Sequence, residues 1–69
     1  MDIESIFNII KMANYPEQAI KEVMDNIHSF NLESKKETLS ALQQRKGSLD
    51  SAEKNQILES IIILLEKEI

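Results

Sequence analysis

The side chains able to carry out chemistry are few in this chain of 69 residues. There is no cysteine, so thiol nucleophiles, disulfides and thiolate metal sites are excluded. His28 is the single histidine, and one imidazole cannot hold a zinc ion by itself. Gly47 is the single glycine, which rules out a glycine-rich loop around a phosphate. Covalent, metal-dependent and nucleotide-dependent chemistry therefore find no support in the residue types.

General acid–base chemistry would need carboxylates that converge in a cleft. Glu17, Glu22 and Asp25 are instead spaced along the faces of a predicted helix that are expected to be exposed. A helical domain of this size also offers little concave volume for a substrate. We therefore expect a protein that is not an enzyme, with no metal site, no cofactor and no small-molecule substrate. His28, near the end of that helix, is expected to be a surface residue favoured there by the helix dipole.

Basic side chains could bind phosphates, but the chain as a whole is acidic, with a net charge of −4. Segment 35–54 is the exception, because it holds five basic and three acidic residues. If the fold gathers the basic ones, they can contact a nucleic-acid backbone. These candidate contacts are Lys35, Lys36, Arg45, Lys46 and Lys54. The alternatives are a solvated helix face, or an acidic protein partner.

The elements that must position these residues are predicted to be helices. Val occurs once and aromatic residues make up 4% of the chain, so strands are not expected. Pro16 suits the first turn of a helix, and Arg45-Lys46-Gly47 is a typical helix end. We predict a single all-α domain over residues 1–69, a small four-helix bundle. The predicted helices run from about Ile3 to Ala13, from about Pro16 to Ser29, from the region of Leu32 to the stop at Arg45-Lys46-Gly47, and from the residue after Asp50 to about Lys67.

The third predicted helix has two candidate starts. Either Asn31 caps it, or Ser34 does so with Glu37 completing a capping box. The second option would place Lys35 and Lys36 at the positive end of the helix dipole, so Asn31 is favoured. Its apolar face is expected to consist of Leu32, Leu39 and Leu42, helped by Thr38. For the fourth helix, Asp50 with Glu53 resembles a capping box.

The fourth predicted helix is long and strongly apolar. Seven of its side chains fall within an arc of about 160°, wider than one neighbouring helix covers. They are Ile57, Leu58, Ile61, Ile62, Leu64, Leu65 and Ile69. A core of this size rarely supplies more than about 3–5 kcal/mol of net stability, which favours support from a second copy. We expect a homodimer in which Ile61, Ile62, Leu65 and Ile69 meet their own copies; core packing within one chain is the alternative.

Two further apolar residues point away from the predicted core. Ile63 projects opposite the apolar arc of the fourth helix, and Met12 lies on the polar side of the first helix. Single exposed apolar residues are common. A contact with a target protein or a second copy is the functional interpretation.

The main hypothesis is a non-catalytic protein–protein interaction module: a small regulator, inhibitor, adaptor or chaperone that uses an apolar helix face. The acidic first half would favour basic partners. The alternative is a nucleic-acid-binding transcriptional regulator that uses segment 35–54 of a dimer. A helix-turn-helix motif fits this segment poorly, because the acidic Glu37 lies among its basic residues. A third hypothesis is a scaffolding role in a phage or mobile element.

The expected location is the cytoplasm, with no membrane contact. The first residues lack the positive charge and apolar run of a secretory signal. The longest apolar run, Ile61–Leu65, is far shorter than the roughly 20 residues that span a bilayer. Isoleucine outnumbers leucine, and asparagine and lysine are frequent, a composition associated with AT-rich bacterial or phage genomes.

Overall fold

The computed structural model describes residues 1–69 and contains four α-helices and no strand, which confirms the all-α class. The helices are α1 (Ile3–Met12), α2 (Pro16–Ile27), α3 (Leu32–Gln44) and α4 (Ala52–Glu66). They form a compact globule of 30 × 22 × 20 Å. None of the four helices combines the length and the apolar character that crossing a bilayer would require.

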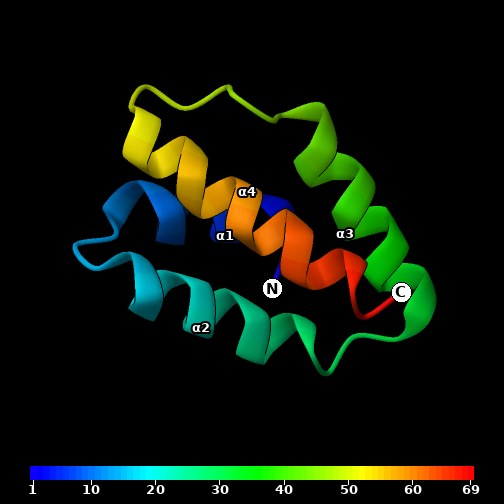
Figure 1. The fold of residues 1–69 in the computed structure, drawn as a ribbon. Coiled ribbons are helices and arrows are strands. Elements are labelled where there is room, and N and C mark those ends of the chain that lie inside the picture. The colour runs from blue at the N-terminus through cyan, green and yellow to red at the C-terminus, as the bar shows by residue number, and fades with distance from the viewer.

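Helix α4 lies at the centre of the fold and packs against each of the other three helices (Figure 1). Helix α2 follows α1 after a short connection and packs antiparallel to it, and it runs beside α4 in nearly the same direction (Figure 1). Helix α3 crosses the end of this layer and closes the globule (Figure 1). The central place predicted for the fourth helix is thus what the structure shows.

The core is a single cluster of 12 buried apolar residues drawn from all four helices. Helix α4 supplies the largest share, and α3 supplies only one member. The members are Ile6, Phe7 and Ile10 of α1, Ala19, Val23 and Ile27 of α2, Leu42 of α3, and Ile57, Leu58, Ile61, Ile62 and Leu65 of α4. Five of the seven side chains in the predicted apolar arc are therefore covered within one chain, whereas Leu64 and Ile69 are exposed, contrary to the prediction.

Side-chain caps fix where α1 and α3 begin. The Ser5 amide donates to Asp2 Oδ1 at 2.8 Å, and this hydrogen bond to the charged form lowers the pKa of Asp2. The Ser34 amide donates to Asn31 Oδ1 at the same distance of 2.8 Å. Asn31 is thus the cap of α3, as predicted, and Gly47 follows α3 with a φ of +76° that only glycine adopts easily.

The predicted start of α4 was wrong by one residue. Ser51 is the cap, because the Lys54 amide donates to its hydroxyl at 3.1 Å. The Asn55 side-chain amide binds both backbone groups of Leu49, at 3.0 and 3.1 Å. That double hydrogen bond holds the preceding loop in place, and the first turn begins after Ser51 and not after Asp50. Helix α4 has 15 residues, against 13 in α3, and is less long than predicted.

The apolar face predicted for α3 was also partly wrong. Leu42 and Thr38 are buried and Leu39 is partly buried, but Leu32 is exposed. The reason is that the first turn of α3 meets the polar C-terminal tail and not the core. Lys35, one turn after Leu32, has its Nζ atom 2.9 Å from Glu68 Oε1.

Candidate protein-interaction surfaces

The contact residues predicted on the fourth helix divide into two groups. Ile61, Ile62 and Leu65 are buried in the core of the single chain, while Ile63 and Ile69 are exposed. Since α1, α2 and α3 all pack against α4, the first group has no surface left for a second copy. The structure thus corrects the expectation that these three side chains meet their own copies. Ile69 also lies beyond the end of α4 and has left the apolar arc.

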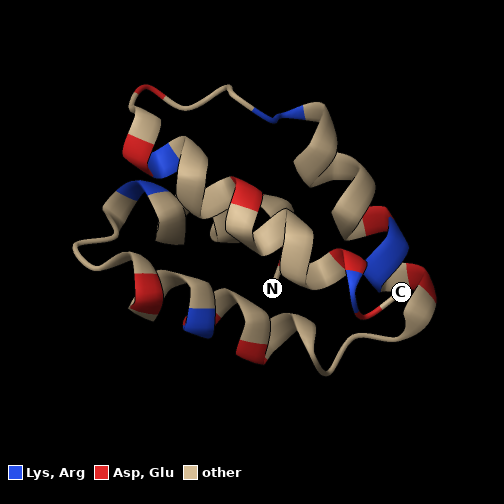
Figure 2. Cartoon of the chain, in the orientation of Figure 1, with Lys and Arg blue, Asp and Glu red and all other residues tan.

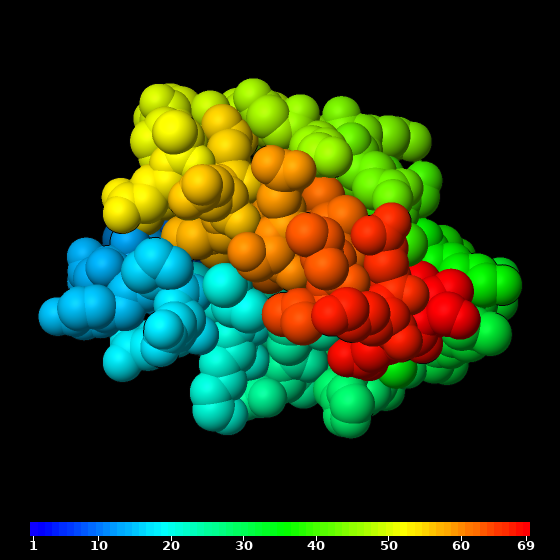
Figure 3. Space-filling model, in the orientation of Figure 1, coloured from blue at the N-terminus to red at the C-terminus, as the bar shows by residue number.

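The side of α4 turned away from the core carries a mixed apolar and charged surface. Ile63 is 53% exposed and Leu64 is 37% exposed. Glu59 and Lys67 lie four residues before and after Ile63, and thus on the same side. We call these four residues the α4 outer face. In the space-filling view, the orange segment of α4 lies uncovered between α2 and α3 (Figure 3).

Helix α2 extends this apolar surface sideways. Ile20 lines a shallow hollow together with Ile57 and Ser60, and His28 Nδ1 lies 3.3 Å from Glu68 Oε1. The shared hollow at one end and the His28–Glu68 pair at the other indicate that α2 and α4 run parallel, side by side. Met24, halfway between Ile20 and His28, is therefore level with Ile63 and Leu64, and it is partly buried.

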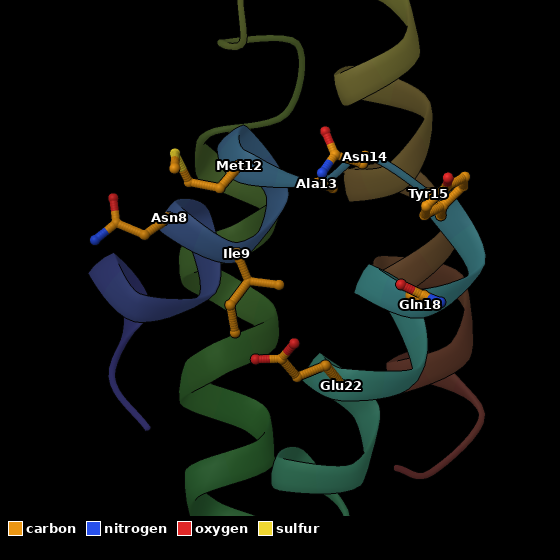
Figure 4. A pocket seen from close by; sticks show the side chains of 8 residues that line it. All are labelled: Asn8, Ile9, Met12, Ala13, Asn14, Tyr15, Gln18 and Glu22. Carbon is orange, nitrogen blue, oxygen red and sulfur yellow. The ribbon is translucent and has the colours of Figure 1, made fainter.

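A second apolar surface lies at the connection between α1 and α2. Met12 is 80% exposed and Tyr15 is 65% exposed, which makes them the most exposed large hydrophobic residues of the chain. They stand at the sides of a hollow of about 460 Å³ into which Ile9, Gln18 and Glu22 point (Figure 4). We call this hollow the α1–α2 groove. Its lining residues are Asn8, Ile9, Met12, Ala13, Asn14, Tyr15, Gln18 and Glu22.

Local backbone chemistry sets the shape of the α1–α2 groove. Tyr15 precedes Pro16, and a residue before proline is held out of the helical conformation; its φ and ψ are −129° and 117°. Lys54 Nζ donates to the Ala13 carbonyl at 2.6 Å and so satisfies a free acceptor at the end of α1. Tyr15 was not among the predicted contacts. The signal for its exposure was its place before a proline, in a connection between two helices that is too short for its side chain to reach the core.

The charge around the α1–α2 groove is negative. Lys21 forms an ion pair with Asp25, with Nζ and Oδ2 2.9 Å apart. Glu17 and Glu22 form no ion pair. Lys11, the basic residue of α1, lines a different hollow with Leu49 and Asp50. Glu22 is therefore a carboxylate without a cation at the edge of a hollow whose lining is half apolar and half polar.

The basic residues of segment 35–54 do not gather on one surface. Figure 2 shows them in three places: at the start of α3, at its end, and in the first turn of α4. Three of the five pair with acids of the same chain: Lys35 with Glu68 at 2.9 Å, Arg45 with Glu4 at 3.0 Å, and Lys46 with Glu59 at 3.3 Å. Lys54 binds the Ala13 carbonyl, and Lys36 is exposed with no ion pair. Most of this positive charge thus serves contacts within the fold.

Two of these basic contacts have features beyond simple charge pairing. The Arg45 guanidinium carbon lies 3.7 Å from the centre of the Phe7 ring, a cation–π geometry. The ion pair with Lys35 lowers the pKa of Glu68, partial burial opposes this, and His28 adds to the lowering. The Glu68 contacts tie the end of α2 and the start of α3 to the C-terminal tail.

Nowhere do three or more His, Asp or Glu side chains come close enough together to hold a metal ion. Comparison with known proteins gives no significant match among protein-family models, curated proteins or solved structures.

Proposed function

We propose that this chain is a non-catalytic protein-interaction module that binds a basic, apolar segment of another protein in the α1–α2 groove. Such a module would serve as a small regulator, inhibitor, adaptor or chaperone. The observation that carries the proposal is the placement of Met12 and Tyr15 on either side of one hollow. Full burial of an apolar side chain of this size stabilises a complex by about 1.5–3 kcal/mol.

The groove also specifies the chemistry of its partner. Ile9 and Ala13 give the hollow an apolar wall, which suits an aliphatic or aromatic side chain. Glu22 at its edge, with Glu17 on the same helix, suits a lysine or arginine next to that side chain. Complementary charge of this kind raises the association rate and selects among partners more than it raises affinity.

Site-specific photocrosslinking tests the proposal. A photoreactive benzoylphenylalanine replaces Tyr15, and the protein is irradiated in cells that naturally produce it. We expect one other protein to be captured, through a peptide that carries a lysine or arginine beside an apolar residue. Met12→Ser or Glu22→Lys in the same chain should remove that product, while the circular dichroism spectrum stays helical.

The matched control places the same crosslinker at Glu33, which is exposed on α3. Identical products from the two positions would contradict the proposal, because the capture would then not depend on the groove. So would a Tyr15 product that persists in both groove variants, or the absence of any product.

A further inference from the structure

The α4 outer face carries an ordered pattern of charge. Glu59, Ile63 and Lys67 are four residues apart and so line one side of the helix. Ile63 is half exposed, the side chain of Glu59 is 50% exposed, and Lys67 is exposed. An acid and a base thus lie at equal distances on either side of a central isoleucine.

That pattern is complementary to itself. When two identical helices cross antiparallel about a twofold axis, residues at equal steps on either side of the axis face each other. With Ile63 on the axis, Glu59 of one copy faces Lys67 of the other, and symmetry repeats the pair. We propose that the α4 outer face binds a second copy of this chain in this antiparallel arrangement.

The charges of Glu59 and Lys67 favour this antiparallel arrangement over a parallel one. In a parallel pair each residue would face its own copy, so Glu59 would oppose Glu59 and Lys67 would oppose Lys67. Like charges in contact are destabilising, whereas the antiparallel pair brings only opposite charges together. Three residues from the axis, Glu66 faces Ser60, which adds no repulsion.

The contacts already present in one chain leave room for the second copy. Glu59 pairs with Lys46 through Oε1, at 3.3 Å, so its other oxygen can accept from Lys67 of the second copy. Leu64, which follows Ile63 in the chain and is 37% exposed, supplies further apolar surface near the axis.

The proposed dimer is independent of the proposed binding groove. Ala13, at the end of α1, is tied to the first turn of α4 by Lys54, whereas Ile63 lies in the last turns of α4. The two surfaces are therefore at different ends of α4, and a dimer would present two grooves to a partner. Either surface can fail its test without affecting the other.

Sedimentation equilibrium of the full chain, from low to high micromolar concentration, tests the dimer by charge reversal. We expect the wild type to dimerise and Glu59→Lys and Lys67→Glu each to weaken dimerisation at least tenfold, because each creates two repulsive pairs. The double variant should recover the wild-type affinity. A mixture of the two single variants should form a mixed dimer, since opposite charges then face each other at both positions.

Two controls separate the interface from effects within one chain. Glu53→Lys makes the same charge change at an exposed position far from the axis and should leave dimerisation unchanged. Lys46→Ala removes the internal partner of Glu59 and should not weaken dimerisation. A wild type that is monomeric throughout, or single variants that dimerise as well as it does, would overturn the proposal. A mixture that forms no mixed dimer would do the same.

Discussion

Helices α3 and α4 have nearly the same length, 13 and 15 residues, but they are held in the fold in different ways. Helix α4 buries five large apolar side chains against its three neighbours. Helix α3 buries Leu42 and Thr38, and only the first of these belongs to the apolar core. The hydrophobic effect therefore fixes α4 in the fold, whereas α3 depends more on other contacts.

Those other contacts are polar and lie along the rim of α3. Lys35, Arg45 and Lys46 each pair with an acid elsewhere in the chain, and Gln43 donates to Glu66 Oε2 at 3.4 Å. Exposed ion pairs contribute about 0–1 kcal/mol each, against about 1.5–3 kcal/mol for a fully buried aliphatic side chain. We therefore expect α4 to supply most of the stability of the fold, and the ion pairs of α3 to help Leu42 orient this helix on the core.

The largest effect is expected from Leu58→Ala in α4. Leu58 is fully buried, and removing such a side chain costs about 2–5 kcal/mol. Because a domain of this size has a net stability of about 3–5 kcal/mol, this change should remove a large part of the free energy of unfolding. Urea unfolding followed by circular dichroism measures the change.

Ile63→Ala is the matched control, because it shortens a half-exposed side chain of the same helix and should change the unfolding free energy of one chain little. Equal losses in Leu58→Ala and Ile63→Ala would show that the two sides of α4 do not differ in the way the comparison requires.

A smaller effect is expected from Arg45→Ala, at the residue that follows the last residue of α3. The guanidinium stacks on Phe7 and pairs with Glu4, and its side chain is 35% exposed. Loss of both contacts should lower the unfolding free energy by about 1 kcal/mol. Arg45→Lys keeps the charge but not the flat stacking surface, so it should recover only part of the loss.

Lys36→Ala is the control for Arg45→Ala, since Lys36 belongs to the same basic segment and forms no ion pair. A midpoint of unfolding that shifts equally in the two alanine variants would mean that the Arg45 contacts do not help to dock α3.

The sequence was sufficient to predict the number of helices and most of their starts, because a few residues carry that information. Pro16, Asn31 and Gly47 start or end helices through local backbone chemistry that does not depend on the rest of the fold. The cap of α4 could not be predicted in the same way. Ser51 was preferred over Asp50 because a loop contact made by Asn55 fixes the backbone before it.

The surfaces were harder to predict than the helices. Periodicity predicted the exposure of Met12 and Ile63, since each lies off the apolar side of its own helix. Periodicity predicted the width of the apolar arc of α4 but not the number of neighbouring helices that cover it. Ile61 and Leu65 were therefore predicted to lie in a dimer interface. Contacts between distant segments, such as Arg45 with Glu4, leave no trace in local spacing.

The smallest effect is expected from the pH dependence of the Glu68 contact at the start of α3. The Lys35 ammonium lowers the pKa of Glu68 below its ordinary value of 4.5, so the folded state favours the charged carboxylate. This contact stabilises the fold above the ordinary value and is lost as the pH falls through the lowered one. The unfolding midpoints of the wild type and Glu68→Gln should therefore differ near neutral pH and converge as the pH falls below 4.5 and through the lowered pKa of Glu68.

The convergence has a direct spectroscopic check and a matched control. Carboxyl chemical shifts from an NMR titration should place the pKa of Glu68 below 4.5. Glu37→Gln removes an exposed carboxylate of α3 that lies beyond the first turn and forms no ion pair, so it should not reproduce the gap that Glu68→Gln shows near neutral pH. A gap between wild type and Glu68→Gln that stays constant into acid would mean that the charge of Glu68 does not hold the first turn of α3. Docking of α3 would then rest on Leu42 and on the contacts at its other end.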